Sequence, residues 1–198
     1  MRVQLQFGGV LLAAFSAVLS LAATPQQDAK TPQQIDAQKS SITVRVYKTG
    51  LFSAFAHNHE IHAPIQEGSF AATKRTVEFT VDAKQLRVMD PDASSSDRIQ
   101  VQANMQGAEV LDVGKFPEIK FSSTSVEPNG AGKWKVLGNL TLHGQTHPVG
   151  VDVQGGSGHY TGSATLKQTD FGITPIRIAG GSIKVRDEVR VEFEIFGK

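Results

Sequence analysis

Apolar and polar side chains alternate with a period of two along most of the chain after residue 40. The last such stretch, EVRVEFEIFG, puts Val189, Val191 and Phe193 on one side and charged residues on the other. Successive side chains of a β-strand point to opposite faces of the sheet. The stretches SITVRVYK, TVEFTVD and PVGVDVQ repeat the pattern. It predicts strands with one dry and one solvated face, which is typical of antiparallel sheets.

Turn sequences separate these stretches, among them PNGAGK at 128–133, HGQTHP at 143–148 and GGSGH at 155–159. A spacing of roughly 10 to 15 residues between turns favours an antiparallel meander. A strongly twisted sheet of this kind must close on itself or stack on a second sheet to hide its edges. We therefore expect a mainly all-β protein in which seven or eight strands form a barrel.

One region lacks the alternation. It follows serine and aspartate residues that are typical helix caps, and it ends before Gly114 and Pro117. These signals predict one helical insertion over Ser95 to Leu111, which we expect to plug or cap the barrel.

The N-terminus has the layout of a secretory signal peptide. An apolar stretch from Val10 to Leu21 follows Arg2 and leads to small residues at Ala22 and Ala23. The run is shorter than the roughly 20 residues that span a bilayer, so we expect an exported protein, periplasmic or secreted, that is not an integral membrane protein. We expect a signal peptide over 1–23, a disordered linker rich in Gln, Pro and Ala over 24–34, and one domain over 35–197.

Charge and composition exclude several classes of function. Without residues 1–23 the chain keeps 19 basic and 19 acidic side chains and no Lys/Arg block, which argues against a nucleic-acid partner. The chain has no cysteine, so disulfides, thiolate metal sites and thiol catalysis are excluded. Nucleophile elbows, dinucleotide turns and phosphate loops are absent from the sequence. We expect no enzymatic activity.

Two long motifs resemble the YceI-like family of exported, lipocalin-like proteins. The first is MQGAEVLDVGKFPEIKFSST, with Phe116, Pro117 and Ile119; the second is WKVLGNLTLHGQTHPVGVDV, with Gly144 and Pro148. The likeness extends over about residues 35 to 197. It implies an extended antiparallel β-barrel around an apolar tunnel that holds a polyisoprenoid chain, such as an isoprenoid quinone, or another long amphiphile. An eight-stranded barrel is wide enough for one slender ligand or for its own side chains.

The resemblance also suggests which residues line the tunnel and where the chain departs from the family. Many members carry histidines where this chain has Lys39 and Lys48; lysines there could meet an anionic or carbonyl head group at a barrel mouth. The bulky residues expected nearest the cavity are Phe52, Phe55, Phe70, Phe79, Phe121, Leu140, Phe171 and Phe193. Each of these side chains could equally be ordinary core.

The stretch FAHNHEIHA suggests an alternative. On a strand, His57 and His59 would share one face and could chelate Zn²⁺ or Cu²⁺ if His143 or His147 supplied further ligands. Otherwise these histidines form hydrogen bonds in turns or lie in solvent.

The leading hypothesis is thus a non-catalytic carrier that transports or sequesters an isoprenoid-like lipid and requires no cofactor. The alternative is a periplasmic metal-binding or redox accessory protein. A homodimer is possible for either.

Overall fold

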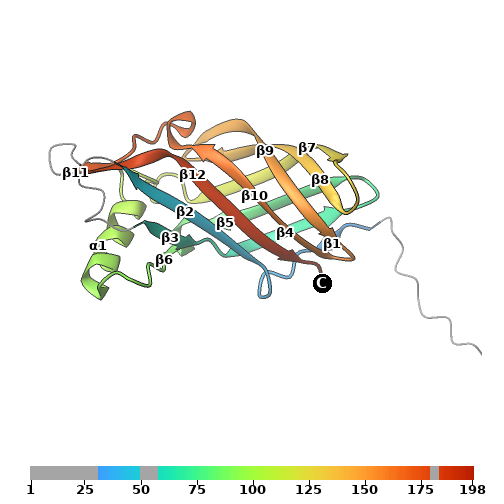
Figure 1. The fold of residues 1–198 in the computed structure, drawn as a ribbon, viewed down its shortest axis with the longest axis horizontal. Helices are drawn as coiled ribbons and strands as arrows, with labels where there is room; N and C mark the ends of the chain where they lie inside the picture. Colours follow the sequence, from blue (N-terminus) through green and yellow to red (C-terminus); the bar gives the residue numbers. More distant parts are fainter. Residues whose placement is uncertain (1–30, 50–57, 179–182) are drawn as a thin grey trace, which may run out of the picture.

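The computed structural model describes residues 31–49, 58–178 and 183–198. In these residues, 12 strands form one antiparallel sheet that curls around a long axis (Figure 1). One α-helix and two short 3₁₀ helices, η2 and η3, join the strands. The elements are β1 (Gln33–Gln34), β2 (Ser41–Thr49), β3 (His59–His62), β4 (Ile65–Ala71), β5 (Thr76–Asp82), η2 (Ala83–Gln85), β6 (Arg87–Val88), α1 (Ser95–Gln106), β7 (Glu118–Pro128), β8 (Lys133–Leu142), β9 (Gln145–Gly156), β10 (His159–Lys167), η3 (Gln168–Phe171), β11 (Arg177–Ile178) and β12 (Ile183–Phe196).

The long strands form a barrel, as the sequence predicts. Hydrogen-bonded neighbours follow in the order β4, β5, β7, β8, β9, β10, β12, β2 and β3. β3 and β4 are separated only by Ala63 and Pro64, and they pair with β2 and β5 respectively. The bent segment β3–β4 therefore joins the two ends of the sheet. Counting β3–β4 as one bent strand gives an eight-stranded ring, within the expected seven or eight.

β1 closes the end of the barrel where the chain terminates. Gln33 and Gln34 pair with β4, and the next residue, Ile35, forms an isolated bridge with Gly197. Ile35 is buried at 3% exposure. The folded domain thus begins two residues earlier than the expected start at 35, because the last two residues of the predicted linker take part in the sheet. The predicted signal peptide and the linker up to residue 30 lie outside the described residues.

The alternating stretches fold as predicted, with their apolar side chains on the inner face. Ile42 faces Phe193 across β2 and β12, and Val44 faces Val191; all four belong to the hydrophobic core or pack against it. On the outer face, Arg45 donates hydrogen bonds to Glu192 (2.8 Å) and Glu60 (2.6 Å). These hydrogen bonds raise the pKa of Arg45, and the bond to Glu192 contributes most. They connect β2 to β12 and to β3 on the outer face.

The helix is shorter than the predicted 95–111. It begins after Ser94, whose hydroxyl accepts a hydrogen bond from the Asp97 amide, as an N-cap does. It ends at Gln106, because the following Gly107 has an extended backbone and turns the chain. Leu111 lies in the turns beyond and is buried at 9% exposure. No helix in the described part of the chain is long and apolar enough to cross a bilayer.

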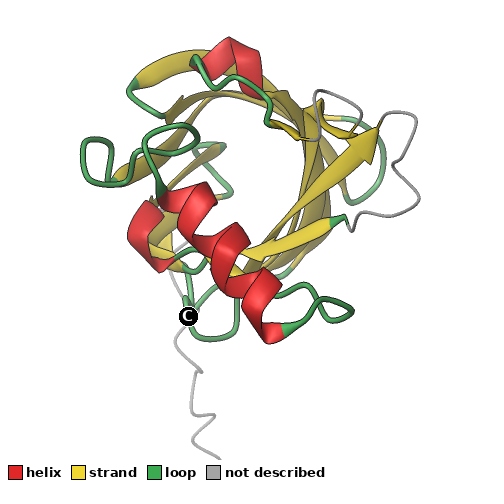
Figure 2. Cartoon of the chain, turned by 90° about the vertical axis from the view of Figure 1, so that its left-hand side faces the viewer, coloured by secondary structure: helices red, strands yellow, loops and turns green. Residues whose placement is uncertain are grey.

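Helix α1 lies at one end of the barrel, which we call the helix end (Figure 2). Its one buried residue is Met105, so apolar packing holds the helix only weakly. A polar bridge adds to it: the Gln102 side chain accepts a hydrogen bond from the Val88 amide (2.8 Å) and donates one to the Leu86 carbonyl (2.8 Å). Gln102 thus attaches α1 to β6.

We expect Gln102→Ala to lower the free energy of unfolding by about 1–3 kcal/mol, because the backbone groups of Leu86 and Val88 lose their partner. Chemical denaturation followed by circular dichroism measures this. Gln100→Ala is the matched control: its amide bonds only to Asn104 on the same exposed helix face, and we expect a change within about 0.5 kcal/mol. Equal effects of both substitutions would contradict the bridge.

Candidate functional site

The inner wall of the barrel is apolar but only partly buried. Val149, Val151 and Val153 of β9 pack against the core, yet all three keep intermediate exposure. The intervening residues Pro148 and Gly150 face outward and are exposed. Strand residues sealed in a filled barrel would be as buried as Val81, at 2% exposure. Solvent therefore reaches part of this inner wall.

Two glycines allow aromatic rings to lie along the wall. A Cβ atom at Gly138 would be 2.6 Å from Cε2 of Phe121, so the Phe121 ring covers Gly138. In the same way, a Cβ atom at Gly162 would be 3.0 Å from Cε1 of Phe193. Phe79 stacks on Phe121 with 5.4 Å between ring centroids. Rings over glycines occupy the space of a missing side chain, which leaves the barrel axis less obstructed.

The structure places most of the predicted lining residues on this wall. Phe70, Phe79 and Phe193 are partly buried, and Phe121 and Leu140 are buried at 6% and 8% exposure. Phe79, Phe121 and Leu140 are direct cross-strand partners and form one layer. Their contact with a ligand stays a prediction. Phe52 and Phe55 lie outside the described residues.

Phe171 differs from the other predicted lining residues because it comes from η3 at the helix end. It is almost fully buried, at 1% exposure. Phe171 therefore does not line the wall; together with the rest of η3 it fills the helix end of the barrel, and we call this segment the η3 plug. Thr169 of η3 donates hydrogen bonds from its amide and hydroxyl to Asp187 of β12. Partial burial by itself would raise the pKa of Asp187. The hydrogen bonds from Thr169 stabilise the carboxylate more strongly, so the pKa of Asp187 is lowered.

Two aromatic residues of the inner wall were missed by sequence reasoning. The Tyr160 ring packs edge-on between Phe70 (5.2 Å between centroids) and Trp134 (5.7 Å). This trio lies at the end opposite α1, which we call the far end, because Tyr160 is next to the β9–β10 turn. The signal was present: Trp134 alternates with Lys133 and Lys135 as an inward residue should.

The histidines do not form a metal site in the part of the chain that the structure describes, where no three possible metal ligands come together. His143 lies in the β8–β9 turn and bonds through Nδ1 to the Phe171 carbonyl (3.0 Å). The His147 ring contacts the Phe171 ring edge-on, at 5.4 Å. Both histidines thus support the η3 plug. His57 lies outside the described residues.

His59 has a different partner, an aspartate that sequence reasoning did not assign to it. Nδ1 of His59 lies 2.6 Å from Oδ2 of Asp90, and Asp90 is buried at 2% exposure. Oδ1 of Asp90 accepts a hydrogen bond from the Glu60 amide (2.7 Å). The two residues are 31 positions apart, so only the pairing of β3 with β6 brings them together.

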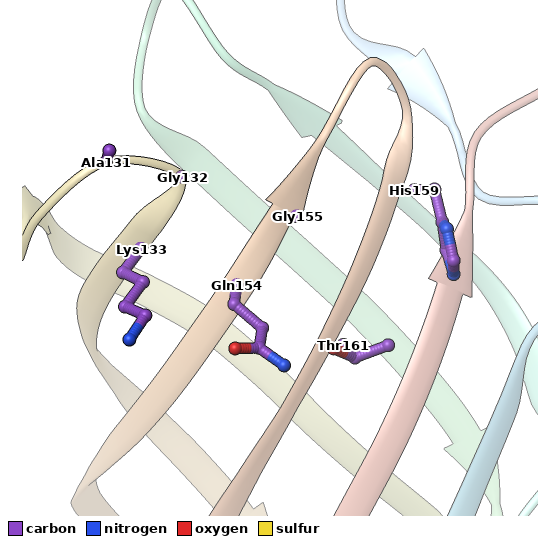
Figure 3. A pocket seen from close by; sticks show the side chains of 7 residues that line it. All are labelled: Ala131, Gly132, Lys133, Gln154, Gly155, His159 and Thr161. Atoms are coloured by element: carbon purple, nitrogen blue, oxygen red, sulfur yellow. The ribbon is translucent and has the colours of Figure 1, made fainter.

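The outer face carries a shallow groove at the far end, shown in Figure 3. Its volume is about 370 Å³ and its side chains are polar: Lys133, Gln154, His159 and Thr161. A neighbouring depression of about 570 Å³ adds the opposite charges of Asp152 and Arg190. Sites for apolar ligands are concave and mostly apolar. The inner wall, not this groove, has the chemistry for an apolar chain.

Comparison with known proteins agrees with this architecture. The family model described as YceI-like domain matches residues 33–196. A UPF0312 protein of Shewanella putrefaciens is 30% identical over 173 residues, which cover 82% of this chain and 86% of that protein. A UPF0312 protein of Vibrio parahaemolyticus is 28% identical over 135 residues, covering 63% and 68%.

Two solved structures have the same fold. Burkholderia cenocepacia BcnA matches with a TM-score of 0.58 and 21% identity, over 81% of this chain and 98% of that one. A Campylobacter jejuni YCEI protein matches with a TM-score of 0.50 and 15% identity, over 63% and 72%.

The glycine–phenylalanine contacts generate a test of the wall. Gly138→Ala is expected to lower the free energy of unfolding by about 1–3 kcal/mol, because the new methyl group displaces the Phe121 ring. Gly150→Ala is the control, since its Cβ would face outward and meet Leu137 Cδ2 at 3.7 Å and Lys135 Cε at 3.9 Å, which are ordinary contact distances. Thermal and urea unfolding of both variants provide the measurement. A tolerated Gly138→Ala would mean that Phe121 does not depend on this glycine.

Proposed function

Because the chain belongs to the family of proteins with a YceI-like domain, we propose that it is a non-catalytic binding protein for a long apolar molecule. In this proposal the barrel holds the hydrocarbon chain of an isoprenoid-like lipid, such as an isoprenoid quinone, or of a similar amphiphile. The lipid is carried or sequestered away from water, and no cofactor takes part.

One observation carries the proposal: inward-facing apolar side chains of a closed barrel keep solvent exposure. Burying apolar surface yields about 25 cal/mol per Å², so a wall of exposed valines favours an apolar guest. Val149, Val151 and Val153 supply such a wall on β9. Phe193 of β12 adds a partly buried ring to the same inner face.

The proposal includes export. Residues 1–23 have the composition of a cleaved signal peptide, so the carrier would act in the periplasm or outside the cell. Mass spectrometry of the protein recovered from its own host would then find an N-terminus after Ala22 or Ala23. An intact Met1 on the functional protein would argue against export.

The binding of an apolar chain can be tested by filling the barrel. We expect Val151→Trp to abolish lipid co-purification and to weaken binding of geranylgeraniol by at least about tenfold, because the indole occupies the place of the guest. Asp152→Trp puts the same indole on the outer face of the same strand and should leave binding unchanged. Native mass spectrometry and displacement of a fluorescent fatty acid measure both.

The free energy of unfolding of Val151→Trp distinguishes a barrel with free space inside from one that is filled by its own side chains. In a hollow barrel Val151→Trp keeps the stability of the parent protein, since the indole enters open space. In a filled barrel the same change overpacks the core and costs about 1–3 kcal/mol. Strong destabilisation together with an absence of bound lipid would overturn the proposed function.

A further inference from the structure

The side chain of His59 lies on the inner face of the barrel, close to the helix end. His59 is the direct cross-strand partner of Val46, and directly paired residues share one face. Val46 packs against the hydrophobic core. Ile61, two residues further along β3, is a buried member of that core. His59 is therefore a polar group among apolar neighbours of this wall.

Asp90 fixes the orientation of this histidine. Its carboxylate is buried and is itself held by the Glu60 amide, so it cannot follow the imidazole if the ring moves. A neutral imidazole that donates its Nδ1–H to Asp90 presents a lone pair at Nε2. Nε2 makes no hydrogen bond to a described residue, and no buried polar side-chain atom of these residues is unpaired. Nε2 is therefore accessible.

Lys48 supplies a hydrogen-bond donor on the same inner face. Strand alternation puts Lys48 on the same face of β2 as Val46 and Val44, and its amide bonds to Asn58, which immediately precedes His59 on the chain. No ion pair joins its ammonium to a carboxylate within the described ranges. The acidic residues beside this site are engaged elsewhere: Glu60 of β3 binds Arg45, and Asp90, which follows β6, binds His59.

We propose that His59 and Lys48 form the head-group site of the barrel and that they recognise a hydroxyl group at the end of the apolar chain. The hydroxyl donates its proton to Nε2 of His59 and accepts a hydrogen bond from the Lys48 ammonium. Asp90 is a positioning residue that keeps the lone pair of His59 directed at the ligand. The inference rests on the proposed function, because it assumes that the chain of the same molecule occupies the barrel.

Two ligands that differ in one hydrogen-bond donor test the site. Geranylgeraniol carries a hydroxyl group, whereas its methyl ether keeps the acceptor oxygen and lacks the donor. We expect the parent protein to bind the alcohol about tenfold more tightly than the ether, since one good hydrogen bond is worth about that ratio. Displacement of a fluorescent fatty acid gives both dissociation constants.

The variants assign the two hydrogen bonds separately. His59→Asn keeps an N–H for Asp90 but deletes Nε2, so the preference for the alcohol should vanish while the ether binds as before. Lys48→Met should weaken alcohol and ether by the same factor, because both offer an acceptor oxygen. Asp90→Asn should also remove the preference, since an amide donor forces the proton onto Nε2.

Matched controls lie on the same elements or carry the same charge. His62→Asn changes a histidine of β3 that pairs with Thr43 on the outer face. Lys39→Met removes an exposed lysine that forms an ion pair with Asp36 at the far end. Both controls should keep the alcohol preference. In ¹⁵N-labelled protein, geranylgeraniol should shift the Nε2 resonance of His59 and leave that of His62 in place.

Each result has a distinct meaning. Equal affinity of the parent protein for alcohol and ether, or a preference that survives His59→Asn, would overturn the head-group site and leave the carrier intact. Binding of neither compound would overturn the proposed function together with this inference. Circular dichroism of each variant verifies the barrel before binding is measured.

Discussion

The structure depends on the closure of one antiparallel sheet. An open sheet of this length would expose unpaired backbone groups along two edges. Here the bent segment β3–β4 pairs with β2 on one side and with β5 on the other, so the ring of hydrogen bonds has no long free edge. Because closure fixes which side of every strand is inner, it also places the valines of β9 and His59 on the same inner face.

The bulk of the side chains is distributed unevenly along the inner wall of the barrel. Large side chains concentrate at its two ends. Phe171 and Met105 fill the helix end, and Tyr160 with Trp134 occupies the far end. Between them the wall has valines together with Phe79, Phe121, Leu140 and Phe193, and the rings of Phe121 and Phe193 approach Gly138 and Gly162 closely. The same apolar residue types could form a fully buried core, so residue type alone does not explain the partial exposure of the wall valines.

The sequence predicts the wall of this barrel better than its ends. Alternation locates β2, β5, β9 and β12 correctly because strand periodicity is a local property of the chain. The helix was placed correctly at its start, where Ser94 caps it, but extended too far, because the stop at Gly107 requires knowing where the chain must turn to reach β7. Five of the six described lining residues lie on the wall, whereas Phe171 does not, since a 3₁₀ turn places it at the helix end. The His59–Asp90 pair could not be foreseen, because it depends on the register of β3 against β6.

Helix α1 lies outside the ring of paired strands and is attached to the barrel in large part through polar side chains. The helix is held by the buried Met105, by Val101 packed against the core, and by hydrogen bonds from Gln102 and Gln106 to the backbone of residues 84–88. It takes no part in strand pairing. Because Gln102 and Gln106 bind backbone groups of residues 84–88, a substitution at either position would loosen the helix end of the barrel while leaving the hydrogen bonds between its long strands in place.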